Sequence, residues 1–528
     1  MMRTRLLVGV LLCLGLSPHA VLRAQEALPT HQLVIYADQG QVQISRHIYG
    51  HFIEHLGYGI YGGFWQRDAQ GRWHLRQDII EALRHIRIPN LRWPGGCFAD
   101  LYHWKDGIGP REQRPPILNA FWGQVVEDNS FGTHEFMELI EALGAEPYIA
   151  GNVGSGTPRE MAEWVEYLTA EDGPMARLRK QNGREKPWRV PFWGVGNESW
   201  GCGGHMDPEH YADLYRRFAT YLFNYSGNQL YKVAAGPADA DTTWTSVLMR
   251  HVFRRYPWLM QGISVHYYTW ISKTGNWNDK EPAVGFDEWG WFQGLKKGLF
   301  LDNVLRGHKA VMDRYDPEKR VGLVVDEWGM WHAPEPGSNP AFLVQQNTLR
   351  DALVAAVSLN IFNHHADRVK MANLAQTINV LQALILTREG EDTIVRTPTY
   401  HVFDLYKEHQ DATLVPIALE AGEYRYGNEA IPALNASASR NAEGAVHLTI
   451  ANLDPHQERV VHCRLEGARP ARVVGRVLTA DAMDAHNTFE APNRVQPTAF
   501  TGYRQLGNGV YELRLPAKSV VALTFYPN

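Results

Sequence analysis

The fold is decided by the pattern that residues 190–204 show, VPFWGVGNESWGCGG. A short apolar run ends at Gly196, and an amide, a carboxylate and a glycine-rich turn follow it. The next stretch, PEHYADLYRRFATYLF (208–223), repeats its apolar residues at steps of three and four, as an amphipathic helix does. The pattern therefore predicts a buried strand, a polar loop and a helix.

The same alternation of strand and helix recurs from Tyr49 to about His409. Eight such units predict an α/β fold, a (β/α)8 barrel of the TIM type. A doubly wound open sheet is the alternative, but no glycine-rich nucleotide fingerprint follows an early strand. The strand candidates are residues 49–55, 90–96, 146–152, 192–198, 231–237, 262–268, 321–327 and 369–376.

The remainder of the chain has a different character. After about residue 410, apolar and polar residues alternate between turn signals, which predicts an antiparallel β-sandwich of the jelly-roll kind. Residues 31–45 alternate in the same way, so we expect them to join that sandwich. The predicted division is a signal peptide (1–24), N-terminal strands (25–48), the catalytic barrel (49–410) and the C-terminal β-sandwich (411–528).

Charge and the N-terminal residues narrow the class of protein. The net charge is −5 with no basic block, which argues against a nucleic-acid partner. Arg3 and Arg5 precede an apolar run, residues 6–16, that is too short to span a membrane. This order is typical of a secretory signal, so we predict an exported, periplasmic or secreted, protein with no membrane anchor.

Two carboxylates end predicted strands. Glu198 ends the fourth and Glu327 the seventh, and the active site of a β/α barrel lies at this end of its strands. Glycosidic bonds are cut by such a pair, one group protonating the leaving oxygen and the other attacking the sugar or activating water. Glu288 shares the string DEWG with Glu327, but its polar, proline-containing context argues against a catalytic role.

Long motifs resemble a known family. The strings GNE (196–198) and DEW (326–328) resemble the acid/base and nucleophile motifs of retaining barrel glycosidases. Together with three further stretches they resemble glycoside hydrolase family 51, the α-L-arabinofuranosidases, over essentially the whole mature chain. Those stretches are GHFIEHLGYGIYGG (50–63), RWPGGCFADLYHWKDGIGPREQRP (92–115) and ANLAQTINVLQALI (372–385).

The resemblance implies a role for each site residue. Glu198 is expected to be the general acid/base and Glu327 the nucleophile, with Arg92 lowering the pKa of Glu327 so that it stays ionised. Asn197 matches an asparagine that hydrogen-bonds the sugar 2-hydroxyl. The other expected substrate contacts are Glu54, Cys97 (where many relatives have asparagine), Tyr268 and Gln376.

The implied activity is the release, with retention, of terminal L-arabinofuranose from arabinan, arabinoxylan or related hemicellulose side chains. No metal or organic cofactor is expected, and relatives often form hexamers. Two alternatives stay open. The first is β-xylosidase or endoglucanase activity at the same site, and the second is a non-catalytic carbohydrate-binding protein, which the presence of both carboxylates disfavours.

Three other features have competing interpretations. His51 and His55 in HFIEH suggest metal ligands, but they do not form HExxH on a helix. Cys97 and Cys202 fall on loops of the expected catalytic face, and we expect no disulfide between them because it would occupy the sugar pocket. The aromatic-rich insertion 271–299 is either a hydrophobic cap or a substrate wall, and the wall is favoured.

Overall fold

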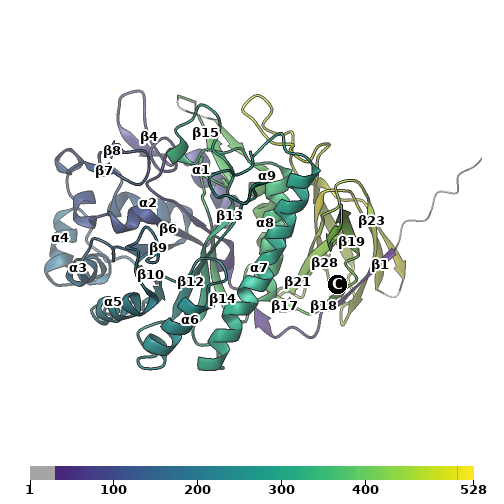
Figure 1. Ribbon diagram of the computed structural model, residues 1–528, viewed down its shortest axis with the longest axis horizontal. Helices are drawn as coiled ribbons and strands as arrows, with labels where there is room; N and C mark the ends of the chain where they lie inside the picture. The colour runs from purple at the N-terminus through teal and green to yellow at the C-terminus, as the bar shows by residue number, and fades with distance from the viewer. Residues whose placement is uncertain (1–29, 389, 392, 508, 528) are drawn as a thin grey trace, which may run out of the picture.

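The computed structural model describes residues 30–388, 390–391, 393–507 and 509–527. The predicted signal peptide, residues 1–24, lies outside these ranges. The described chain forms a barrel ringed by helices and, beside it, a domain built of strands (Figure 1).

Eight parallel strands in the described chain close into a barrel in the order β10-β11-β12-β13-β14-β3-β6-β9. This confirms the predicted fold class. Most residues of these strands are buried, because helices cover the outside and side chains fill the inside. The strands are β3 (Gly50–Phe52), β6 (Asn90–Trp93), β9 (Glu146–Gly151), β10 (Phe192–Val195), β11 (Tyr231–Ala234), β12 (Gly262–Thr269), β13 (Gly322–Met330) and β14 (Val369–Leu374).

Helices follow the strands around the barrel. In α5, Tyr211, Tyr215 and Phe218 form the buried face, at the spacing that the sequence pattern predicts. The helices are α1 (Gln77–His85), α2 (Thr133–Leu143), α3 (Pro158–Thr169), α4 (Pro174–Gln181), α5 (Pro208–Thr220), α6 (Thr242–Leu248), α7 (Glu288–Tyr315), α8 (Leu349–His364) and α9 (Pro398–Tyr406).

The second domain is a sandwich of two sheets. The five-stranded sheet has the order β18-β1-β23-β27-β26 and the seven-stranded sheet β2-β17-β21-β22-β28-β24-β25. Their strands are β1 (Thr30–Tyr36), β18 (Ile417–Leu419), β23 (Arg459–Glu466), β27 (Val510–Leu515), β26 (Tyr503–Gly507), β2 (Val42–Gln43), β17 (Thr413–Val415), β21 (Leu434–Arg440), β22 (Val446–Asn452), β28 (Ser519–Tyr526), β24 (Arg472–Leu478) and β25 (Thr498–Ala499).

Strand β1 brings the N-terminal part of the chain into this sandwich. It pairs antiparallel with β18 but parallel with β23, so the sandwich is not purely antiparallel. In Figure 1 the purple β1 lies among the green and yellow strands of the C-terminal region.

Helices α7 and α8 lie between the barrel and the sandwich (Figure 1). The indole of Trp291 in α7 donates to the Leu453 carbonyl oxygen at 3.0 Å, and the Asn360 amide in α8 donates to Asn435 Oδ1 at 2.8 Å. The described residues also form four two-stranded antiparallel sheets: β4–β5 (Trp65–Arg67, Trp73–Leu75), β7–β8 (Ile117–Asn119, Val125–Glu127), β15–β16 (Ile385–Thr387, Ile394–Arg396) and β19–β20 (Glu423–Tyr426, Glu429–Pro432).

Candidate active site

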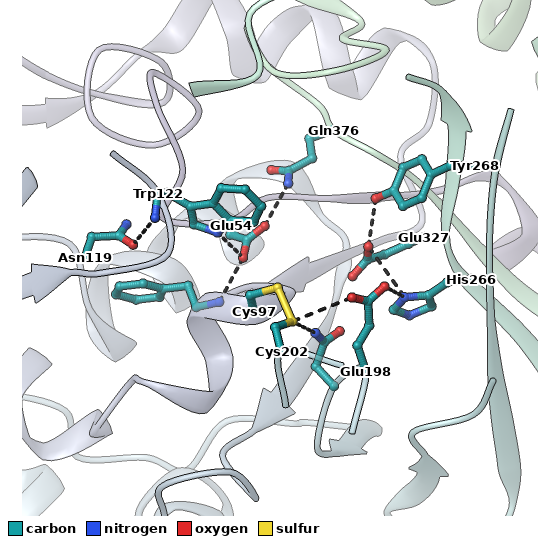
Figure 2. The surroundings of a disulfide bond; sticks show 12 residues. Glu54, Cys97, Asn119, Trp122, Glu198, Cys202, His266, Tyr268, Glu327 and Gln376 are labelled. Atoms are coloured by element: carbon teal, nitrogen blue, oxygen red, sulfur yellow. Dashed lines mark hydrogen bonds and ion pairs between the residues drawn. A yellow bond between two sulfur atoms is a disulfide. The ribbon is translucent and has the colours of Figure 1, made fainter. Parts of the chain in front are cut away.

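The residues predicted for the site lie at the carboxyl ends of the barrel strands. Glu54 follows β3, Glu198 follows β10 and Glu327 belongs to β13. Figure 2 shows that these carboxyl groups point toward one shared space. The remaining predicted residues border the same region: Arg92 in β6, Cys97 in the 3-10 helix η2 (Cys97–Asp100), Asn197 after β10, Tyr268 in β12 and Gln376 after β14.

Glu327 is buried and held from two sides. Its Oε1 accepts a hydrogen bond from Arg92 Nη1 at 2.9 Å, and its Oε2 accepts one from the Tyr268 hydroxyl at 2.7 Å. Burial raises the pKa of Glu327 above its usual value and Glu198 adds to the rise, although His266 and Arg92 lower it. Arg92 therefore lowers the pKa of Glu327, as predicted, but burial outweighs the neighbouring cations and the net shift is upward.

Glu198 lies in the turn that follows β10, and the backbone contacts of this turn explain why its sequence is rich in glycine. The Gly201 and Gly203 amides both donate to the Glu198 carbonyl oxygen, at 2.7 and 3.0 Å. A Cβ on Gly203 would come within 1.9 Å of the Asn197 carbonyl oxygen, so this position requires glycine. Glu198 has a φ of +38°, a conformation that residues other than glycine rarely adopt and that often marks a functional site.

His266, in β12, joins the two catalytic candidates. Its Nδ1 lies 2.8 Å from Glu198 Oε1 and 3.5 Å from Glu327 Oε2, and its Nε2 lies 3.0 Å from Asp326 Oδ1. Atoms from Glu198, His266 and Glu327 all lie within 4.8 Å of one another. This spacing fits a retaining glycosidase, whose carboxyl groups are about 5 Å apart.

The charge of His266 follows from these contacts. Burial alone would lower its pKa, but the charge of Glu327 and the bonded, charged Asp326 raise it to about 10. His266 is therefore an imidazolium at neutral pH, and both of its ring nitrogens donate hydrogen bonds.

Glu54 forms the opposite side of the pocket. It accepts hydrogen bonds from the Phe98 amide at 3.0 Å, the Trp122 indole at 2.9 Å and the Gln376 amide at 3.0 Å. Burial, followed by the charge of Glu327, raises its pKa to about 7. A Cβ on Gly96 would lie 3.0 Å from a Glu327 oxygen and 3.3 Å from a Glu54 oxygen, so a larger residue would crowd both carboxylates.

Arg92 links the nucleophile candidate to the amide that precedes Glu198. Its Nη2 donates to Asn197 Oδ1 at 2.7 Å while its Nη1 donates to Glu327. The Asn197 amide nitrogen therefore faces away from Arg92, and it lies 3.9 Å from Cys202 Sγ.

Cys97 and Cys202 form a disulfide with Cα atoms 5.5 Å apart. The expectation of no disulfide is therefore wrong. Cys202 Sγ lies 3.6 Å from Glu198 Oε2 and 3.9 Å from the Asn197 amide nitrogen. The disulfide therefore borders the space between Glu54, Glu198 and Glu327 (Figure 2). Because its sulfur is covalently bonded, Cys97 has no S–H to donate to a sugar.

The chain matches known families and proteins over most of its length. Residues 82–274 match the model of the alpha-L-arabinofuranosidase 1 domain, and residues 326–519 match that of the alpha-L-arabinofuranosidase C-terminal domain. A Bacteroides ovatus protein named intracellular exo-alpha-L-arabinofuranosidase is 48% identical over 496 residues, which cover 93% of this chain and 95% of that protein. The chain belongs to glycoside hydrolase family 51.

Two solved arabinofuranosidase structures agree with this assignment, and the first of them is a family 51 enzyme. The arabinofuranosidase from Xanthomonas axonopodis pv. citri superposes with a TM-score of 0.89 at 47% identity, covering 94% of this chain and 99% of that one. The Thermotoga maritima α-L-arabinofuranosidase in its arabinose complex has a TM-score of 0.81 at 30% identity, with coverages of 94% and 99%. This family 51 chain is therefore a glycoside hydrolase.

The prediction of export is contradicted. The Bacteroides ovatus relative, which matches 93% of the chain, is named an intracellular enzyme. The prediction depends on a single short apolar run that follows two arginines, and so few residues are a weak basis for a signal peptide. That run lies outside the described residues. Among the described helices none is long and apolar enough to cross a membrane.

Several site residues of this family 51 enzyme were missed by the sequence reasoning. Asp326 accepts from His266 and from the Tyr148 hydroxyl, the latter at 2.7 Å, and Trp122 reaches Glu54 from the β7–β8 hairpin. The string SVHYY did contain a signal, because a histidine in a buried barrel strand requires polar partners.

The competing motifs have structural roles. Asp287 caps helix α7, and Glu288 in its first turn accepts from the Tyr424 hydroxyl at 2.9 Å and pairs with His456 at 3.0 Å. His55 Nδ1 lies 2.7 Å from Glu127 Oε2, so His55 has a carboxylate partner. Burial lowers the pKa of His51 to about 3, so His51 is a neutral, buried side chain. Among the described residues, neither histidine belongs to a cluster with metal-ligand spacing.

The insertion 271–299 has two parts with different surroundings. Trp277 lies edge-on to Trp270 and to Trp331, with ring centroids 5.2 and 4.8 Å apart, and Trp331 packs against Tyr268 of the site. Trp291 is buried against the sandwich. The part around Trp277 is therefore linked to Tyr268 of the site through Trp331, and its role as a substrate wall stays a prediction.

The charge of His266 predicts a specific pH dependence of stability. Its pKa is about 10 in the folded state and 6.5 in a model peptide, so its stabilisation is complete below pH 6.5 and is lost as pH rises toward 10. We expect the melting temperature of the wild type to fall over this range more steeply than that of His266→Gln.

Thermal unfolding at a series of pH values measures this difference. The variant His456→Gln is the matched control, because the His456 side chain is 61% exposed, and it should keep the slope of the wild type. Equal slopes for the wild type and His266→Gln would contradict the proposed charge.

Proposed function

We propose that this family 51 enzyme is a retaining, exo-acting α-L-arabinofuranosidase whose catalytic pair is Glu198 and Glu327. The observation that carries the proposal is the convergence of the two carboxyl groups on His266 at the carboxyl end of the barrel. The names of the relatives support the sugar, because both the Bacteroides ovatus and the Xanthomonas proteins are arabinofuranosidases.

The proposed reaction has two steps. Glu198 protonates the departing oxygen while Glu327 attacks the anomeric carbon, which gives a covalent glycosyl-enzyme. Glu198 then removes a proton from the water that releases arabinose, so the anomeric configuration is retained. Arg92 and Tyr268 orient the attacking carboxylate, and His266 holds Glu198 in place.

We assign the sugar contacts to the other side of the pocket. Glu54 and Gln376 are joined by a hydrogen bond, and Gln376 Oε1 has no partner within the described residues, so it is available to a sugar hydroxyl. Asn197 is assigned to the 2-hydroxyl. The Cys97 sulfur is bonded to Cys202 and has no S–H to donate, so we assign Cys97 only a packing contact with the sugar.

The natural substrate is proposed to be an arabinofuranosyl side chain of arabinan, arabinoxylan or a related hemicellulose. Catalysis is assigned to the barrel, residues 49–410, and a supporting role to the sandwich, residues 411–528.

A hexameric assembly is proposed from the family resemblance alone. Sedimentation of the purified enzyme tests this oligomeric state.

A screen of aryl glycosides tests the proposed activity. We expect the α-L-arabinofuranoside to be hydrolysed at least about tenfold faster than the β-D-xylopyranoside and β-D-glucopyranoside, because the pocket is built around one sugar geometry. Proton NMR of the first product should show the α-anomer. Faster hydrolysis of either pyranoside would support the alternative activities, and an inverted first product would remove the nucleophile role of Glu327.

A further inference from the structure

The Cys97–Cys202 disulfide lies beside the proposed acid/base residue. Cys97 begins η2 after β6, and Cys202 lies in the turn after β10. Cys202 Sγ lies 3.6 Å from Glu198 Oε2 (Figure 2). Both cysteines are half-buried, so a small reductant can reach the bond from the pocket.

The three side chains form a set of potential metal ligands. The two sulfurs and a Glu198 oxygen all lie within 4.8 Å of one another. Two thiolates and a carboxylate suit a thiophilic divalent cation such as Zn²⁺, with Zn–S distances of about 2.3 Å. A cysteine sulfur binds such a cation as a thiolate and not as part of a disulfide. The Cys97–Cys202 bond therefore has to be reduced before the two sulfurs and Glu198 can bind an ion.

We propose that the reduced form of Cys97 and Cys202, together with Glu198, binds a thiophilic divalent cation, and that the disulfide closes this site. A dithiol reductant supplies two electrons and two protons to the disulfide and becomes a disulfide itself. The two thiol protons leave when the ion binds, so sulfur, charge and protons balance. Three protein ligands leave the fourth position of a tetrahedral ion to water.

An ion bound at this site would act at the cost of catalysis. Glu327 interacts electrostatically with Glu198 and attracts a cation, whereas His266, whose Nδ1 lies 2.8 Å from Glu198 Oε1, opposes it. A Glu198 carboxylate that ligates the ion cannot carry a proton, so the metal-bound enzyme should be inhibited. This inhibition rests on the proposed function, whereas the binding does not.

Cobalt absorption tests the binding without reference to activity. The enzyme is reduced with a water-soluble phosphine, which takes the oxygen of a water molecule while the two protons of that water go to the sulfurs. The phosphine is removed under argon, and Co²⁺ is added. We expect a thiolate-to-cobalt charge-transfer band that saturates near one equivalent in the reduced enzyme, is absent from the oxidised enzyme and is displaced by Zn²⁺.

Two variants sharpen the result. Cys202→Ser should lose the band, whereas Cys463→Ala, which removes the buried thiol of the sandwich, should keep it. No band in the reduced wild type, or an equal band in Cys202→Ser or in the oxidised enzyme, would overturn the site.

Zn²⁺ should then lower kcat of the reduced enzyme by about 10²-fold or more, reversibly on chelation, and leave the oxidised enzyme unchanged. Cobalt binding without inhibition would remove Glu198 from the ligand set. If the enzyme hydrolyses no arabinofuranoside at all, the cobalt titration still decides whether the site exists.

Discussion

Glu327→Ala is expected to lower kcat on an aryl α-L-arabinofuranoside by about 10⁴-fold or more, because the variant loses the group that forms the covalent intermediate. Arg92 and Tyr268 would keep their positions but have no carboxylate to orient. Steady-state kinetics on protein whose thermal unfolding shows a native fold provides the measurement.

Glu288→Ala is the matched control, since Glu288 shares the DEWG string but bonds Tyr424 and His456 of the sandwich. Its kcat should stay within about tenfold of the wild type. A large loss in Glu288→Ala together with a small loss in Glu327→Ala would reverse the assignment of the nucleophile.

Glu198→Ala should show an effect that depends on the leaving group. With an acidic aryl leaving group, formation of the glycosyl-enzyme needs little protonation and should survive. With a sugar leaving group the rate should fall by about 10²- to 10⁴-fold, because the general acid is missing. Hydrolysis of the intermediate should be slow in both cases, since the same residue activates water.

Added azide distinguishes this role from a structural one. A small anion needs no general base, so azide should speed turnover of the activated substrate and give an arabinosyl azide of retained configuration. Asn197→Ala should instead slow both substrates, because its proposed hydrogen bond strengthens at the transition state whatever the leaving group. Equal losses for Glu198→Ala with every leaving group, and no azide effect, would leave Glu198 with only a structural role.

The sequence predicted the features that depend on local order along the chain. Eight apolar runs, each followed by a helical period, are sufficient to indicate the barrel, because strand and helix differ in their repeat. A carboxylate directly after such a run must lie at the strand's carboxyl end. For this reason the linear chain indicates that Glu198 and Glu327 lie at the same end of the barrel. The prediction that Glu327 ends its strand is wrong, because β13 continues to Met330. The catalytic roles of the pair, and the absence of one for Glu288, stay predictions.

Contacts between distant segments could not be predicted in this way. The parallel pairing of β1 with β23 joins residues more than 400 positions apart. Trp122 reaches Glu54 from a hairpin that no pattern links to β3. A cysteine pair at a separation of 105 residues carries no sequence signal either, and the disulfide was rejected on a pocket shape that the sequence does not contain.

The amino-acid sequence by itself determined the barrel, the sandwich and the two carboxylates, because periodicity and strand ends are properties of neighbouring residues. Only the tertiary structure decided their electrostatics. The raised pKa values of Glu327 and His266 result from burial acting against charges brought in from β6, β12 and β13. The sign of such a balance depends on distances and burial across the barrel, which exist only once the chain has closed.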